Sequence, residues 1–99
     1  PKANKQQILG HVIHVDHFGN LVTNIGQRVF SDLSPGRTFT IQFGGERLRS
    51  VQMDYTKTEP GEVLALFNSI GVMEIAVIKG NASALFGLTI DSPVNIIFD

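Results

Sequence analysis

The chain of 99 residues contains no cysteine and no tryptophan. Without cysteine it can form no disulfide bond, thiol nucleophile or thiolate metal site, a composition typical of cytoplasmic proteins. The apolar runs are short, such as VLALF at 63–67, whereas a membrane-spanning helix needs about 20 apolar residues. No signal-peptide pattern heads the sequence. We therefore expect a cytoplasmic protein with no membrane partner.

The chain also lacks an excess of positive or negative charge. Eight Lys and Arg residues and nine Asp and Glu residues give a net charge of −1. Nucleic-acid binding depends on clustered basic side chains that neutralise phosphates, so we expect no nucleic-acid partner. The polar residues 1–6 are interpreted as a linker remnant, and 7–99 as one domain large enough for its own core.

Short alternating apolar stretches, separated by turn residues, follow one another along the chain. The clearest is 37–43, in which Phe39, Ile41 and Phe43 alternate with polar residues before Gly44-Gly45. Similar patterns predict further strands at 7–15, 21–25, 47–53, 63–67, 72–78 and 94–98, and short helices at 26–33 and 82–86. No connection has the length of the helical crossover that parallel strands need. The fold class predicted is all-β, a small antiparallel barrel of about seven strands with one or two short helices.

The first long strand carries apolar residues on both faces. Ile8 and Val12 fall on one face, and Leu9, Ile13 and Val15 on the other. We therefore expect this strand to be buried on both sides or central in a barrel.

The stretch HVDHFGNLVTN at 14–24 concentrates polar and aromatic residues around a turn. Gly19-Asn20 between two strands predicts a tight hairpin, with Gly19 at the first central position of a type II′ turn. Such a turn brings Asp16, Phe18 and Asn20 into one small volume. This group could hold a polar ligand with a flat part, or it could serve the turn alone, since Asp and Asn bond nearby backbone.

The three histidines, at 11, 14 and 17, invite a metal interpretation. Residues three apart on a strand point to opposite faces, so His11 and His14 cannot both reach one ion. No nucleophile elbow accompanies the serines and histidines, and Gly44-Gly45 lacks the helix and Lys-Ser/Thr pair of a phosphate loop. We expect no metal.

Polar turns at 16–20, 54–55, 68–71 and 80–83 should gather at the ends of a barrel, where ligands usually bind. Phe18 and Tyr55 could stack a flat base, and Asn20 could bond an amide-like edge. Each residue also has an ordinary explanation: Tyr55 as a loop anchor, Asn81 as a helix N-cap and Ser69 as a turn hydroxyl.

Five segments, in this order, are similar to those of a known family: VDHFGNLVTN at 15–24, DY at 54–55, GEVLALFNS at 61–69, MEIAV at 73–77 and GNAS at 80–83. The chain resembles the C-terminal domain of the S-adenosylmethionine hydroxide adenosyltransferases, relatives of the fluorinase and chlorinase enzymes. The resemblance covers most of residues 8–98.

The resemblance implies a two-domain hydrolase that is a homotrimer when full length. S-adenosylmethionine is its substrate, no cofactor is used, and the substrate lies between the N-terminal domain of one subunit and the C-terminal domain of its neighbour. Hydroxide displaces methionine from the ribose C5′ and releases adenosine. The Asp-Arg-His set that activates water belongs to the N-terminal domain. We therefore expect half of the substrate site and no catalytic residue in this chain.

Site residues follow from the resemblance at matching positions. Phe18 and Tyr55 would flank the adenine, Asn20 would bond its edge, and the backbone of Asn81 and Ala82 would complete that contact.

At the methionine end the resemblance implies Asp16 and Ser69, with Asp16 opposite the ammonium group, and Glu74 beside them. Ile70 departs from the pattern, because the halogenating relatives carry Arg there to pair with the methionine carboxylate. This departure favours the hydroxide-using branch and leaves recognition of the carboxylate unexplained.

Two alternatives remain open at this point. The chain could be a stand-alone small β-barrel that binds a protein partner or single-stranded nucleic acid, although the scarcity of basic residues argues against nucleic acid. It could also be an oligomerisation domain without catalysis, in which the turn motifs serve folding alone.

Overall fold

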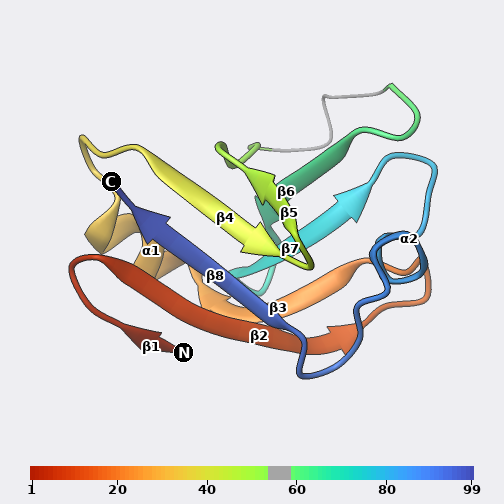
Figure 1. Ribbon diagram of the computed structural model, residues 1–99, viewed down its shortest axis with the longest axis horizontal. Helices are drawn as coiled ribbons and strands as arrows, with labels where there is room; N and C mark the ends of the chain where they lie inside the picture. Colours follow the sequence, from red (N-terminus) through yellow and green to blue (C-terminus); the bar gives the residue numbers. More distant parts are fainter. Residues whose placement is uncertain (54–58) are drawn as a thin grey trace.

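The computed structural model describes residues 1–53 and 59–99, which form a nearly closed antiparallel barrel with two short helices (Figure 1). The predicted all-β fold class is confirmed. The elements in chain order are β1 (Lys2–Ala3), β2 (Gln7–Val15), β3 (Leu21–Gly26), α1 (Gln27–Leu33), β4 (Phe39–Phe43), β5 (Glu46–Leu48), β6 (Val63–Phe67), β7 (Val72–Val77), α2 (Ala82–Phe86) and β8 (Pro93–Phe98).

The strands are hydrogen-bonded in the order β5-β4-β8-β2-β3-β7-β6, and β1 adds to β2. Neighbouring strands in this order are antiparallel. A single parallel bridge from Gln52 to Leu66 of β6 brings the segment after β5 against the other edge of the sheet. This bridge brings the two edges of the sheet toward each other and accounts for the near closure of the barrel.

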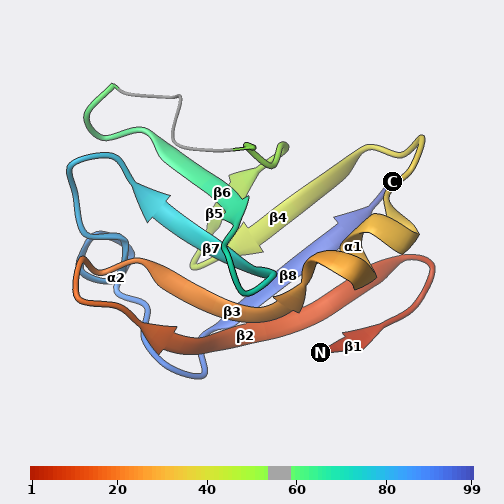
Figure 2. The same ribbon diagram turned by 180° about the vertical axis from the view of Figure 1, so that it is seen from behind.

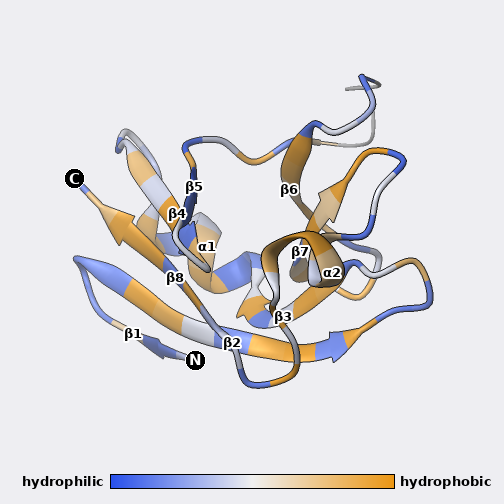
Figure 3. Ribbon diagram, turned by 45° about the vertical axis from the view of Figure 1, so that its right-hand side comes forward, coloured by the Kyte–Doolittle hydropathy of each residue, from blue (hydrophilic) through white to orange (hydrophobic). Residues whose placement is uncertain are grey.

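The strand β2 is central in the barrel, as one of the two expectations had it, but it is not buried on both sides. Ile8 and Val12 are fully buried, whereas Leu9 and Ile13 are 40% and 45% exposed. Val12 pairs with Thr23 and His14 with Val22, so Ile13 is an extra residue in β2 and forms a β-bulge. The bulge reverses the alternation, and Val15 therefore packs against the core. Figure 3 shows the alternating apolar and polar bands along β2.

Two boundaries also differ from the prediction. The strand expected at 47–53 ends at Leu48, because the chain leaves β4 there and crosses toward β6. At the other end, Lys2 and Ala3 pair with Leu9 and Ile8, a short strand that the polar sequence did not indicate. The assignment of 1–6 to a linker stays a prediction.

The core fills the barrel between the inward faces of the strands. Its fully buried side chains include Phe43, Ile8, Leu21, Ile25, Ile41, Met73, Ile75, Ile96, Val12 and Val94. Thr23 is a buried polar residue whose Oγ1 donates to the Met73 carbonyl (2.9 Å) and accepts from the Ile25 N–H (3.1 Å). These bonds lie within the stretch where the β3–β7 register shifts, and they satisfy the hydroxyl without water.

The two helices lie at opposite ends of the barrel (Figures 1 and 2). At one end, Phe30 of α1 contacts Phe39, Phe67 and Phe98, with ring centroids 5.0, 5.5 and 6.2 Å away. The Arg37 guanidinium lies 4.8 Å from the centre of the Phe98 ring. We call this group the aromatic end. Neither α1 nor α2, the helices of the described residues, is long and apolar enough to cross a membrane.

Candidate functional site

The hairpin between β2 and β3 has a three-residue loop rather than the predicted two-residue type II′ turn. The Asp16 N–H donates to the Asn20 carbonyl (3.1 Å), and the Gly19 N–H donates to the Asp16 carbonyl (3.0 Å). His17 and Phe18 are therefore the central residues of the turn. Gly19 follows with φ of 82°, the left-handed conformation expected of the glycine in this loop class. The extra residue places Phe18 at the tip.

Asp16 organises this loop through both of its carboxylate oxygens. Oδ1 accepts from the backbone N–H groups of Phe18 (2.9 Å) and Asn20 (2.9 Å). Oδ2 accepts from Nδ2 of the Asn20 side chain (3.0 Å). The turn role that the sequence suggested for Asp16 is therefore present, and it fixes the position of the Asn20 amide.

The tip of this hairpin is docked on the first turn of α2. The Gly19 carbonyl accepts from the Ser83 N–H (2.9 Å), and a Cβ at Gly19 would overlap the Asn81 amide. Asn81 is the N-cap of α2, as predicted, and its Oδ1 accepts from the Ala84 N–H (2.9 Å). The side chain of Ala82 is fully buried, so only its backbone can face a ligand. Residues 16–20 and 81–83 are thus joined by a hydrogen bond and close packing into one unit.

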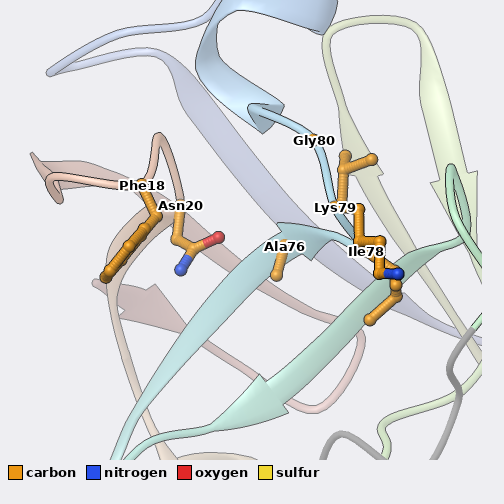
Figure 4. A pocket seen from close by; sticks show the side chains of 7 residues that line it. Phe18, Asn20, Ala76, Ile78, Lys79 and Gly80 are labelled. Carbon is orange, nitrogen blue, oxygen red and sulfur yellow. The ribbon is translucent and has the colours of Figure 1, made fainter.

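A pocket of about 490 Å³ opens beside this unit, within the size range of small-molecule sites. Its lining residues are Phe18, Asn20, Ala76, Val77, Ile78, Lys79 and Gly80. The Phe18 side chain is 71% exposed and meets the His17 ring edge to face. In Figure 4 the Asn20 oxygen lies on the side of Ala76, and Phe18 lies next to Asn20. The pocket therefore offers an aromatic ring and a fixed amide side by side.

The remaining predicted residues lie farther along β7. Val22 pairs with Glu74, and β7 begins after the turn at 68–71. Glu74 accepts from Asn68 Nδ2 (2.9 Å), and Ser69 is exposed in the turn. At the usual rise of a strand, Val72 lies about 13 Å from Ala76. Ser69 therefore lies beyond the end of β7 that is far from Ala76, with Glu74 between the two levels, whereas Asp16 contacts Asn20 in the hairpin loop.

Tyr55 lies outside the described residues. The sequence did not predict that the pocket is also lined by Ala76 of β7 and by Ile78 and Lys79 of the connection between β7 and α2. Lys79 has φ of 54°, a conformation that is uncommon for residues other than glycine. A Lys-Gly pair between a strand and a helix N-cap was the available signal, but it did not show that this turn faces the hairpin.

The histidines do not converge on one ion. The His11 ring faces Asn24, with 3.4 Å between His11 Nδ1 and Asn24 Nδ2. The backbone N–H of His11 donates to Asn24 Oδ1 (2.9 Å). His17 instead contacts Phe18. In residues 1–53 and 59–99, no three His, Asp or Glu side chains group closely enough to hold a metal ion.

Comparison with known proteins identifies the family of the chain. Residues 10–95 match the family model of the SAM hydroxide adenosyltransferase C-terminal domain. No curated protein matches the chain.

Two solved structures show the same fold. An uncharacterized conserved protein from Thermotoga maritima is 29% identical with a TM-score of 0.78, and the match covers 97% of this chain and 37% of that one. A conserved hypothetical protein from Thermus thermophilus is 29% identical with a TM-score of 0.69, covering 90% of this chain and 34% of that one. The chain thus spans about a third of the length of each of these two structures.

Proposed function

The chain belongs to the SAM hydroxide adenosyltransferase C-terminal domain family, and from this membership we propose that it binds the substrate of an S-adenosylmethionine hydrolase. The reaction proposed for the whole enzyme converts S-adenosylmethionine and water into adenosine and methionine. The chain supplies the adenine- and methionine-facing half of the site, and the groups that activate water lie outside these 99 residues.

The observation that supports this proposal best is the pairing of Phe18 and Asn20 at an open pocket. An adenine ring has a flat face and a polar edge, so it needs a stacking surface and a hydrogen-bonding group at its rim. Stacking on an aromatic side chain contributes about 1–3 kcal/mol per base. The Phe18 side chain is 71% exposed, so the ring is accessible to a base. Tyr55 is proposed as the second ring.

The methionine arm is proposed to follow the outer face of β7. From the level of Asn20 this face leads past Glu74 to the turn that holds Ser69, over about 13 Å. Glu74 supplies a carboxylate and Ser69 a hydroxyl along that path, and Asp16 adds a second carboxylate beside the hairpin. Charge-assisted contacts to an ammonium group are strong only where water is excluded.

The pocket is open to solvent on this chain, which favours a site shared with another domain. We propose that the N-terminal domain of a neighbouring subunit covers it in a cytoplasmic homotrimer. The isolated half-site should accordingly bind adenosine weakly, in the high micromolar range or above, on the order of −5 kcal/mol or less favourable.

The proposal is tested by titrating the ¹⁵N-labelled chain with adenosine up to millimolar concentration while recording backbone amide shifts. Binding should move the resonances of 18–20, 81–82 and Tyr55. Shifts scattered over the barrel, or none at any concentration, would contradict an adenine half-site in this chain.

Three variants sharpen the result. Asn20→Ala and Tyr55→Ala should abolish the shifts while changing the unfolding midpoint little. Asn95→Ala is the matched control, because Asn95 is a part-exposed amide on β8 that does not line the pocket. If Asn20→Ala and Asn95→Ala behave alike toward adenosine and differ only in stability, the turn serves folding alone.

A further inference from the structure

The hydrogen bond between Asp16 and Asn20 determines which end of the Asn20 amide is offered to a ligand. A carboxylate oxygen only accepts hydrogen bonds, so the atom that faces Asp16 Oδ2 at 3.0 Å must be the NH₂ group of Asn20. An isolated asparagine could turn its amide over at little cost. If Asn20 did so, its Oδ1 would face Asp16 Oδ2, and two acceptor oxygens would repel each other. Its Oδ1 is therefore held away from Asp16, on the side of Ala76 in the pocket (Figure 4).

This orientation has a chemical consequence. The Asn20 carbonyl oxygen accepts from a donor on the ligand edge, and the second Nδ2 proton remains available to an acceptor next to it. The amino group and ring nitrogen N7 of adenine present this donor–acceptor pair. A 6-oxo purine such as hypoxanthine presents an oxygen where adenine has its amino group, and that oxygen would oppose Oδ1.

We propose that Asp16 is a specificity-determining residue that makes the pocket select 6-amino over 6-oxo purines by locking the Asn20 amide. This inference rests on the proposed adenine site and adds a task for Asp16 beyond its predicted contact with the ammonium group. Asp16 acts through Asn20, so it is a positioning residue for the base.

The two oxygens of Asp16 allow the roles of loop support and amide orientation to be separated. In Asp16→Asn, Oδ1 still accepts from the backbone N–H groups of Phe18 and Asn20, so the loop keeps its shape. The new NH₂ group replaces Oδ2 and cannot accept from Asn20, so the Asn20 amide turns over and directs its NH₂ group at the ligand. In Asp16→Ser, the hydroxyl supports the loop and leaves the Asn20 amide free in both orientations.

The experiment is a parallel titration of each protein with adenosine and inosine, with Asp32→Asn as the control for loss of one charge at an exposed site. The wild type and Asp32→Asn should prefer adenosine by about three- to tenfold, the range of one hydrogen bond. Asp16→Ser should bring the ratio near one, and Asp16→Asn should reverse it.

Equal weakening of both ligands by Asp16→Asn, with the wild-type ratio retained, would overturn the inference and leave the adenine site standing. A wild type that binds neither nucleoside would instead contradict the proposed function. The Asn20 side-chain resonances give a reading that needs no ligand. One Nδ2 proton should exchange more slowly with water in the wild type than in Asp16→Ser, and equal rates would also overturn the inference.

Discussion

The two ends of the barrel use their aromatic residues in opposite ways. At the aromatic end, Phe30, Phe39, Phe67 and Phe98 contact one another and cover the core. At the other end, Phe18 is 71% exposed on a loop that is held by hydrogen bonds to Asp16 and α2. Rings that contact rings stabilise the fold, whereas a ring held in the open by polar contacts contributes little to folding and remains available to a ligand.

The same contrast applies to the backbone. The helix of the aromatic end, α1, has no side-chain cap and packs through the ring of Phe30. Helix α2 is capped by Asn81 and bonded to the hairpin through the Ser83 N–H. Hydrogen bonds fix the position of a segment more sharply than apolar packing does, because they weaken steeply with distance and angle. A site that reads the edge of a base needs that precision.

The largest effect should come from removing the central ring of the aromatic end. Phe30→Ala should lower the free energy of unfolding by about 3 kcal/mol, because it removes three ring contacts and leaves a cavity. Urea denaturation measures the loss. The adenosine-induced shifts of the folded fraction should be unchanged, and their disappearance would show that the two ends are not independent.

A somewhat smaller loss is expected at the joint between the hairpin and α2. Gly19→Ala should cost about 2 kcal/mol, from left-handed backbone strain and displacement of the Asn81 cap. Gly36→Ala is its matched control, since φ is 73° there and nothing lies within 4 Å of the added Cβ. Thermal unfolding should place the loss for Gly36→Ala at about 1 kcal/mol, and equal losses would mean that contact with Asn81 is unimportant.

Substituting the exposed ring of Phe18 tests the contrast between the two ends of the barrel most directly. Phe18→Ala should weaken adenosine binding about tenfold, equal to about 1.4 kcal/mol, while the free energy of unfolding changes by less than about 0.5 kcal/mol. Phe18→Leu keeps the apolar surface and removes the ring face, and should bind as poorly. A large loss of stability in either variant would place Phe18 with the structural aromatic residues.

The smallest effect should come from the helix cap. Asn81→Ala should cost about 1 kcal/mol through the lost bond to the Ala84 N–H, and Asn81→Ser should restore most of it. Circular dichroism during urea denaturation measures both. If the backbone of 81–82 contacts adenine as proposed, Asn81→Ser should also restore the adenosine shifts, and restored stability without restored shifts would assign the contact to the amide itself.

Much of the fold could be predicted because the signals are local. Alternation in 37–43, Gly44-Gly45, the Asn81 cap and Gly87, which ends α2 with φ of 67°, each act over a few residues. The bulge at Ile13 and the early end of β5 could not be predicted in this way. Both depend on how a strand must bend to keep its neighbours paired and bring the sheet edges together.

The candidate site also has a part that could be predicted from local sequence and a part that could not. Asp16, Phe18 and Asn20 are neighbours in sequence, and the chain around them already indicated a turn that gathers an acid, a ring and an amide. Their contact with 81–83 and with Ala76 joins segments more than 50 residues apart, and no local pattern records it. The hydrogen bond from the Ser83 N–H to the Gly19 carbonyl likewise joins two segments that are distant in sequence.

The sequence by itself therefore determined most of the strands, the positions of the main turns, the helix cap and, by resemblance, the family. These depend on backbone preferences and side-chain periodicity that act within one segment. Only the tertiary structure decided which face of β2 is buried, how the Asn20 amide is oriented and that a pocket opens beside β7. These depend on register and on hydrogen bonds between side chains held in place by distant parts of the chain.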